Sequence, residues 1–157
     1  ARDGRANIRL IQADAFDLMA RWVPGGSLDA VHVYFPDPWP KKRHAKRRLL
    51  GRPLFDLSAR ALRTGGILAI ATDVVPYFEE ARETLAAHPC FEETPVTAEA
   101  RESVRTNYAI KYEREGRDFR LASFRRNLAA PPPVPSPPSR RSLRAGTAPP
   151  PSPGDAP

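Results

Sequence analysis

Three aspartates, Asp14, Asp37 and Asp73, each come at or just after the end of a short apolar stretch of the sequence. Such stretches are typical of buried β-strands, and the carboxyl ends of parallel strands meet at one edge of a sheet. We therefore expect the three carboxylates to share that edge, where an open α/β sheet binds its ligands. Each aspartate taken alone has an ordinary alternative, since helix N-caps and turns favour the same residue.

The second of these aspartates lies in a stiff aromatic turn, Phe35-Pro-Asp-Pro-Trp-Pro40. The prolines on either side of Asp37 fix two φ angles and keep the residues before them out of the helical region. Asp37 is thus expected to hold its position before any ligand binds. Trp39 adds a flat surface on which a base could stack. A rigid loop with a packed tryptophan is the structural alternative.

A dense run of positive charge follows this turn. The chain has a formal net charge of +7, and without this run residues 1–129 would be weakly acidic. Such a run favours phosphate, and so nucleic acid, as the ligand, with a solvated surface face as the ordinary alternative. Between residues 41 and 52 there is no acidic residue, and the cations are Lys41, Lys42, Arg43, Lys46, Arg47, Arg48 and Arg52.

Metal and disulfide chemistry are not indicated by the sequence. The three histidines, His32, His44 and His88, lack ligand spacing, and the single Cys90 excludes an internal disulfide framework. His44 lies beside the basic run and is interpreted as a surface or RNA-facing residue rather than an acid–base catalyst. There is no signal-peptide pattern and no apolar run long enough to span a bilayer. These features predict a cytoplasmic protein without a metal or a membrane segment.

The apolar pattern predicts the elements that must position these residues. Strands are expected at residues 8–13, 31–35 and 67–71, helices at 15–22, 53–63 and 76–87, and a closing pair of strands at 91–96 and 119–124. Gly65 and Gly66 are expected to stop the second helix. The alternation of strand and helix predicts an α/β fold with a parallel sheet and right-handed crossovers.

The C-terminal segment has a different composition from the rest. Of the 19 prolines, 11 fall in residues 130–157, where apolar side chains are almost absent. Such a segment cannot bury enough surface to offset its ordering entropy. The sequence therefore predicts one domain at residues 1–129 and a disordered, proline-rich tail at residues 130–157.

The segment YFPDPWPKKRHAKRRL closely resembles the signature of bacterial tRNA (guanine-N7)-methyltransferases. These S-adenosylmethionine-dependent enzymes methylate a guanosine in the variable loop of tRNA. Two later stretches, residues 71–73 and 106–116, resemble further signatures of the family in the same order, so the resemblance spans roughly residues 7–124. It implies a Rossmann-like class I S-adenosylmethionine-dependent methyltransferase fold, with S-adenosylmethionine as cofactor and tRNA as partner.

Carried over position by position, the resemblance implies a role for each matching residue. Asp37 would lie at the reaction centre beside the methyl donor, and Asp14 with Ala15 at the adenine end of the cofactor. The residues implied to contact the RNA substrate are Lys41, Asp73, Thr106, Asn107, Tyr108 and Ala109, together with the basic segment Arg43, His44, Ala45, Lys46, Arg47 and Arg48. The family usually has glutamate at the position of Ala109. Any interaction made by that glutamate is therefore expected to be absent here or moved to Glu113.

The implied reaction requires alignment more than acid–base chemistry. Guanine N7 has a free lone pair in the ring plane, so no base must deprotonate it before attack, and the reacting atoms need near-attack positioning. Methylation leaves positive charge on the imidazole ring, which a fixed carboxylate such as Asp37 would stabilise. Asp37 could equally accept hydrogen bonds from guanine N1–H and N2–H, and both roles stay open from the sequence.

The N-terminal region departs from the family pattern. Methyltransferases of this fold hold the methionine part of the cofactor with a glycine-rich loop, and Gly4 is the only glycine before Pro24. We therefore expect an N-terminally truncated enzyme with weak or no cofactor binding and poor stability. A non-catalytic tRNA-binding module is the alternative function. A dinucleotide-dependent oxidoreductase is disfavoured, because the chain contains no G-x-G-x-x-G.

Overall fold

The computed structural model describes residues 7–133, except for the side chains of Lys42, Ala45, Lys46, Glu99, Ser103 and Glu113. Residues 1–6 and 134–157 lie outside the described residues. The predicted disorder of residues 130–157 falls largely on that undescribed part. The division of the chain into residues 1–129 and 130–157 therefore stays a prediction.

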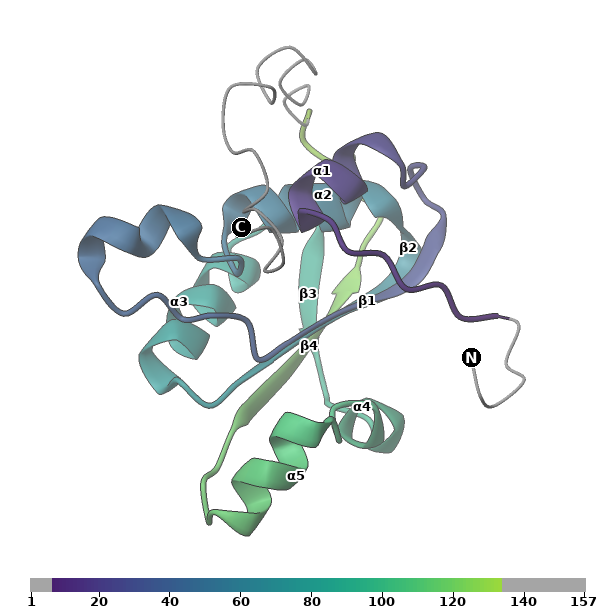
Figure 1. Ribbon diagram of the computed structural model, residues 1–157. Coiled ribbons are helices and arrows are strands. Elements are labelled where there is room, and N and C mark those ends of the chain that lie inside the picture. The colour runs from purple at the N-terminus through teal and green to yellow at the C-terminus, as the bar shows by residue number, and fades with distance from the viewer. Residues whose placement is uncertain (1–6, 134–157) are drawn as a thin grey trace, which may run out of the picture.

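A mixed four-stranded sheet forms the centre of the structure (Figure 1). Its order is β1-β2-β4-β3, with β1 at Leu28–Tyr34, β2 at Leu62–Thr72, β3 at Phe91–Thr94 and β4 at Arg120–Arg126. Strands β1 and β2 are parallel, and β4 pairs antiparallel with both β2 and β3. The α/β fold and the closing pair of strands are confirmed, and β4 inserts between β2 and β3.

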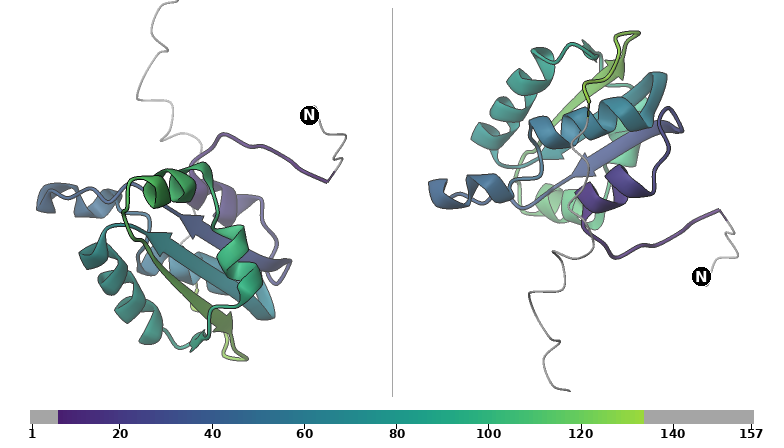
Figure 2. Two further views of the ribbon diagram at one scale, coloured as in Figure 1. Left: turned by 90° about the horizontal axis from the view of Figure 1, so that it is seen from below. Right: turned by 90° about the horizontal axis from the view of Figure 1, so that it is seen from above.

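Helices cover both faces of this sheet. Helices α2 (Arg52–Ala61) and α3 (Val75–Ala86) pack on one face, and α1 (Ala15–Arg21) packs against α2. Helices α4 (Ala98–Ser103) and α5 (Asn107–Arg114) lie over the opposite face (Figure 2). The three predicted helices are confirmed, whereas α4 and α5 were not predicted. A short 3₁₀ helix, η1 (Lys42–Arg47), projects from the body in all views.

Strand β2 is the centre of the core. Leu68, Ala69, Ile70 and Ala71 are all fully buried, as a continuously apolar strand between two helical layers should be. Large side chains from α2, α3 and β4 close around it, and the fully buried ones are Leu54, Phe55, Leu85 and Phe124. Each such side chain contributes about 1.5–3 kcal/mol by leaving water, so the parallel pair β1–β2 rests on a substantial core.

Residues 8–13 do not form the predicted strand. Ile8, Leu10 and Ile11 are 52%, 96% and 64% exposed, and none of the four strands of the sheet pairs with this segment. A strand satisfies its backbone groups only through a neighbouring strand, so an apolar pattern alone cannot form one. As a consequence, two parallel strands rather than three end at the ligand-binding edge.

Gly65 and Gly66 do not stop the second helix as predicted. The helix ends at Ala61, and β2 begins at the next residue and runs through both glycines, where the β1–β2 register shifts. Gly65 has a φ of 82°, which favours glycine. A Cβ on Gly66 would lie 3.0 Å from the carbonyl oxygens of both Arg63 and Asp29. The two glycines therefore permit an irregularity inside the strand.

Candidate functional site

Asp37 and Asp73 follow neighbouring parallel strands and lie at the same edge of the sheet. The register pairs Tyr34 with Ala71, and the Phe35 N–H continues the pairing by donating to the Ala71 carbonyl at 2.8 Å. Asp37 comes two residues after Phe35 and is exposed, whereas the side chain of Asp73 is 14% exposed. The structure thus brings together two of the three aspartates in the way the sequence predicted.

Asp14 has a different setting. It precedes α1, and its Oδ1 accepts a hydrogen bond from the Asp17 N–H at 3.0 Å. It follows no strand, so its placement matches the ordinary alternative of a helix N-cap. Ala15 is the first residue of the helix and is half-buried. The adenine-side roles of Asp14 and Ala15 stay predictions.

The turn that carries Asp37 has an unusual backbone. Phe35 has a φ of 51° and Trp39 a φ of 43°, both in the left-handed region that bulky side chains rarely adopt. The prolines were expected to keep Phe35 and Asp37 out of the helical region; Phe35 has a positive φ rather than the extended backbone that a following proline favours. Such conformations persist only where the surrounding structure holds them.

Three aromatic rings hold Phe35 in place. Its ring centroid lies 6.2 Å from that of Tyr108, 5.5 Å from Tyr112 and 5.4 Å from Phe119. We call these three rings together with that of Phe35 the aromatic cluster. Ring pairs at these separations add attraction beyond their burial. The cluster fixes α5 and the start of β4 against the end of β1.

Helix α5 presents the residues of the third predicted motif. Thr106 caps it, because its Oγ1 accepts a hydrogen bond from the Ala109 N–H at 3.3 Å. Asn107 and Tyr108 are exposed, Tyr108 at 59%, and can reach a ligand. Ala109 is fully buried, so its position offers a ligand no side chain. A compensating interaction by Glu113 stays a prediction, because the side chain of Glu113 is not described.

Asp73 is joined to α5 by an arginine that the sequence analysis missed. The Arg117 guanidinium donates to the Asp73 carboxylate, and its Cζ lies 4.3 Å from the Tyr112 ring centroid. Burial, followed by the negative charge of Asp73, raises the pKa of Tyr112. Arg117 directly follows Gly116, which has a φ of 64°. The sequence signal that could have identified Arg117 is a glycine followed by a cation at the end of the third motif.

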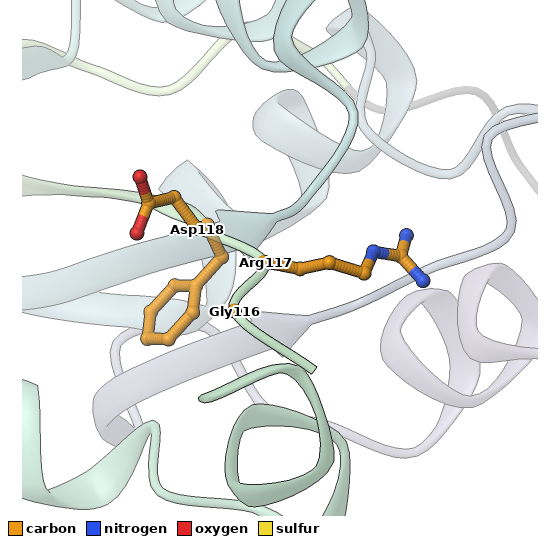
Figure 3. A pocket seen from close by; sticks show the side chains of 4 residues that line it. Gly116, Arg117 and Asp118 are labelled. Carbon is orange, nitrogen blue, oxygen red and sulfur yellow. The ribbon is translucent and has the colours of Figure 1, made fainter. Parts of the chain in front are cut away.

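A hollow lies beside this ion pair. It has a volume of about 370 Å³ and is lined by Gly116, Arg117, Asp118 and Phe119. Figure 3 shows Arg117 and Asp118 pointing to opposite sides of the chain. Phe119 belongs to the aromatic cluster, so the hollow adjoins the edge where Asp73 lies. Asp118 is a further exposed carboxylate that the sequence analysis did not identify.

Two side chains of the basic segment contact Trp39. The Arg47 Cζ lies 5.0 Å from the Trp39 ring centroid, and the His44 ring meets the same indole edge-on at 5.6 Å. Lys41, Arg43 and Arg47 are exposed. The projecting η1 segment therefore presents positive charge next to the Asp37 turn. The side chains of Ala45 and Lys46, also predicted to contact RNA, are not described.

Two cations of this run are paired with carboxylates of the protein. Arg48 donates to Glu80 of α3 at 2.6 Å and to the Pro38 carbonyl at 3.0 Å, and Arg52 donates to Asp56 of α2 at 2.8 Å. The run thus contains Arg48 and Arg52, which are paired with carboxylates, beside the exposed Lys41, Arg43 and Arg47. A direct contact of Arg48 with RNA stays a prediction.

The described residues provide only part of a binding site for S-adenosylmethionine. Asp14 has one carboxylate oxygen beyond the one that caps α1, which could accept from the adenine amine. No glycine-rich loop follows β1 or β2, since the first glycines after them are Gly51 and Gly116. By themselves, therefore, residues 7–133 do not form a complete site for this cofactor.

Neither a metal site nor a membrane span is found in the described part of the chain. Within residues 7–133, no three His, Cys, Asp or Glu side chains gather as metal ligands would. None of the helices described there combines the length and the apolar character that crossing a bilayer requires.

Comparison with known proteins places these residues in context. A family model described as "Putative methyltransferase" matches residues 1–123. A protein from Paracidovorax citrulli named tRNA (guanine-N(7)-)-methyltransferase is 52% identical over 86 residues, covering 55% of this chain and 34% of the relative. Proteins of the same name from Nitrosococcus oceani and Streptomyces avermitilis are 36% identical over 126 residues and 49% identical over 94 residues. These matches cover 80% and 60% of this chain, and 53% and 32% of the relatives. The chain thus spans about a third to a half of their length.

Proposed function

Because this chain belongs to the putative methyltransferase family, whose model matches residues 1–123, we propose that the protein containing it methylates tRNA. In this proposal a methyl group passes from S-adenosylmethionine to N7 of a guanosine in the variable loop. The relatives named tRNA (guanine-N(7)-)-methyltransferase, at 36–52% identity, support this choice of substrate. A cytoplasmic location follows from tRNA as the substrate.

One observation carries the proposal: three segments far apart in the sequence converge at one edge of the sheet. The aromatic cluster joins the turn after β1 to α5, and the Arg117–Asp73 ion pair joins the end of β2 to the same region. The cations of η1 follow the same turn. Carboxylates, exposed aromatic side chains and phosphate-binding cations are the groups that recognition of a guanine within RNA requires.

The chain's own residues then supply the acceptor side of the reaction. Asp37 is exposed on a turn held by the aromatic cluster, so its carboxylate can face a guanine without first moving. There it accepts hydrogen bonds from N1–H and N2–H or stabilises the charge that develops on the imidazole ring. S-adenosylmethionine, when bound, supplies the electrophilic methyl group. Lys41, Arg43 and Arg47 hold the neighbouring phosphates.

Replacing Asp37 by Asn tests the proposal in the protein that contains this chain. The variant keeps the shape and an acceptor oxygen but loses the charge, so methyl transfer should fall by about 10²–10³-fold. The tRNA dissociation constant should change little. The measurement is transfer of labelled methyl from S-adenosylmethionine to unmodified tRNA, with the position of 7-methylguanosine mapped in the tRNA sequence.

Asp29→Asn is the matched control, because Asp29 lies at the start of β1, at the end of the strand opposite to the Asp37 turn, and its side chain is 84% exposed. It should keep full activity. If the parent protein binds tRNA in a salt-sensitive way but forms no 7-methylguanosine, the protein is a non-catalytic tRNA-binding module. Equal losses in both variants would contradict a role for Asp37 in the reaction.

A further inference from the structure

Arg48 makes four interactions that all lie within the protein. Its Nε donates to the Pro38 carbonyl at 3.0 Å and its Nη2 reaches the Trp39 carbonyl at 3.5 Å. Its Nη1 donates to Glu80 at 2.6 Å, and its Cζ lies 5.5 Å from the Tyr77 ring centroid. The side chain is only 22% exposed. We call this arrangement the Arg48 clamp.

The two carbonyls belong to the turn that carries Asp37. Pro36, Pro38 and Pro40 lack an N–H, so this turn has few backbone donors with which to brace itself. Trp39 is held in the left-handed region at a φ of 43°, which needs support from outside the turn. Arg48 supplies donors to this stretch from ten and nine residues further along the chain.

The other side of the clamp is a fixed part of α3. Tyr77 is 2% exposed, and its hydroxyl accepts a hydrogen bond from the Leu50 N–H at 2.8 Å. Glu80 lies on the same helix, three residues later. The guanidinium thus contacts a buried ring and a carboxylate of α3. Because it also donates to the two carbonyls of the turn, it fixes the turn relative to α3.

We propose that Arg48 is a positioning residue, which fixes the Pro38–Trp39 backbone and so the orientation of Asp37 and Trp39 instead of contacting RNA. The proposal rests on the proposed function, because it concerns the same reaction. A lysine cannot replace Arg48, since a single ammonium cannot address two carbonyls and a carboxylate in the planar geometry of the guanidinium.

Arg48→Lys tests the clamp while keeping the charge. We expect kcat to fall about tenfold or more, because small misplacements of reacting groups are costly. The KM for tRNA and the dependence of binding on salt should stay close to those of the parent protein. Glu80→Gln should change kcat in the same direction by a smaller factor. Arg82→Lys is the matched control, since Arg82 is an exposed arginine of α3 paired with Glu93 at 2.7 Å.

A second measurement reports on the mobility of the turn and does not depend on catalytic activity. Trp22 and Trp39 are the two tryptophans of this chain, so replacing Trp22, and any tryptophan of the parent protein outside this chain, by Phe leaves Trp39 as the single tryptophan fluorophore. In that background, Arg48→Lys should lower the fluorescence anisotropy of Trp39, and Arg82→Lys should not. This readout also separates the two proposals, because a protein without methyl transfer would refute the proposed function while the anisotropy still tests the clamp.

Two results would overturn the clamp. If Arg48→Lys or Arg48→Ala flattens the salt dependence of tRNA binding as strongly as Arg47→Ala does, Arg48 contacts a phosphate. If Arg48→Lys leaves kcat and the Trp39 anisotropy at their parent values, the guanidinium does not position the turn.

Discussion

His88 is a buried histidine whose two ring nitrogens both have partners. Its Nδ1 accepts a hydrogen bond from the Cys90 N–H at 3.1 Å, and its Nε2 lies 3.0 Å from Oδ1 of Asp56. The neutral ring therefore carries its proton on Nε2. Burial is the main cause that lowers the pKa of His88 below its ordinary 6.5, with Asp56 opposing and Arg52 assisting.

This lowered pKa predicts how stability depends on pH. The unfolded chain takes up the proton near pH 6.5 and the folded chain only at lower pH, so unfolding is favoured as the pH falls. The contribution is complete above about pH 6.5 and is lost as the pH falls through the folded pKa. As the pH falls through this range, the free energy of unfolding should therefore decrease more steeply in the parent protein than in the His88→Gln variant. The difference between the two slopes should be at most about 1.4 kcal/mol per pH unit.

Urea denaturation of both proteins between pH 5 and 8 measures that difference. The comparison uses the pH slopes, which are insensitive to a constant loss of stability in the variant. Identical slopes would show that His88 takes up its proton equally in both states.

At the residue scale, the sequence identified the aspartates of the site better than it identified the residues that interact with them. Asp37 and Asp73 were placed correctly because each follows a strand that forms. Asp14 was assigned to the same edge, but it caps α1, because the strand before it is not present. The ion pair of Asp73 with Arg117 could not be foreseen, since 43 residues separate them in the sequence.

At the scale of elements, the sequence predicted all four strands of the sheet and three of the helices, but it added one strand that does not form and missed α4 and α5. A helix satisfies its backbone hydrogen bonds within one segment, so the local patterns of α1, α2 and α3 were sufficient. A strand depends on a distant partner, and residues 8–13 have a strand pattern without one. Helix α5 was missed because its apolar signal is confined to Ala109, Ile110 and two tyrosines.

The irregularity in β2 gives a prediction for Gly66. Because two backbone carbonyls stand 3.0 Å from where its Cβ would be, Gly66→Ala should shift the β1–β2 pairing. We expect it to lower the free energy of unfolding by about 1–3 kcal/mol, as overpacking does. Thermal and urea denaturation would measure the loss.

Gly51→Ala is the control for this change. Gly51 has an extended backbone with a φ of −167°, and the nearest atom to its Cβ would be Pro53 Cδ at 3.9 Å. Its effect should stay within about 0.5 kcal/mol. If the two variants are equally stable, close approach of the backbones is not what requires glycine at position 66.

At the scale of the whole molecule, the positive charge is concentrated on the part that projects from the body. The chain carries a net charge of +7, and its densest run of cations lies on or beside η1, which projects from the body (Figures 1 and 2). Of that run, Arg48 and Arg52 are paired with carboxylates of the protein, Arg52 at a half-exposed position, whereas Arg43 and Arg47 are exposed. Composition indicates phosphate as a ligand, but only the structure separates the cations that can meet phosphate from those that brace the fold.

This division predicts the salt dependence of tRNA binding. Each phosphate that a variant no longer binds should flatten the slope of log K against log salt by about 0.7–0.9. Arg43→Ala with Arg47→Ala should therefore reduce the slope by about two such steps, whereas Arg52→Ala, taken from the same run, should leave it unchanged because Arg52 is paired with Asp56. Filter binding of tRNA between about 50 and 200 mM salt measures the slopes of the parent protein and both variants. An equal flattening by Arg52→Ala would mean that the ion pairs within the protein do not decide which cations bind RNA, and that the segment acts only through its total charge.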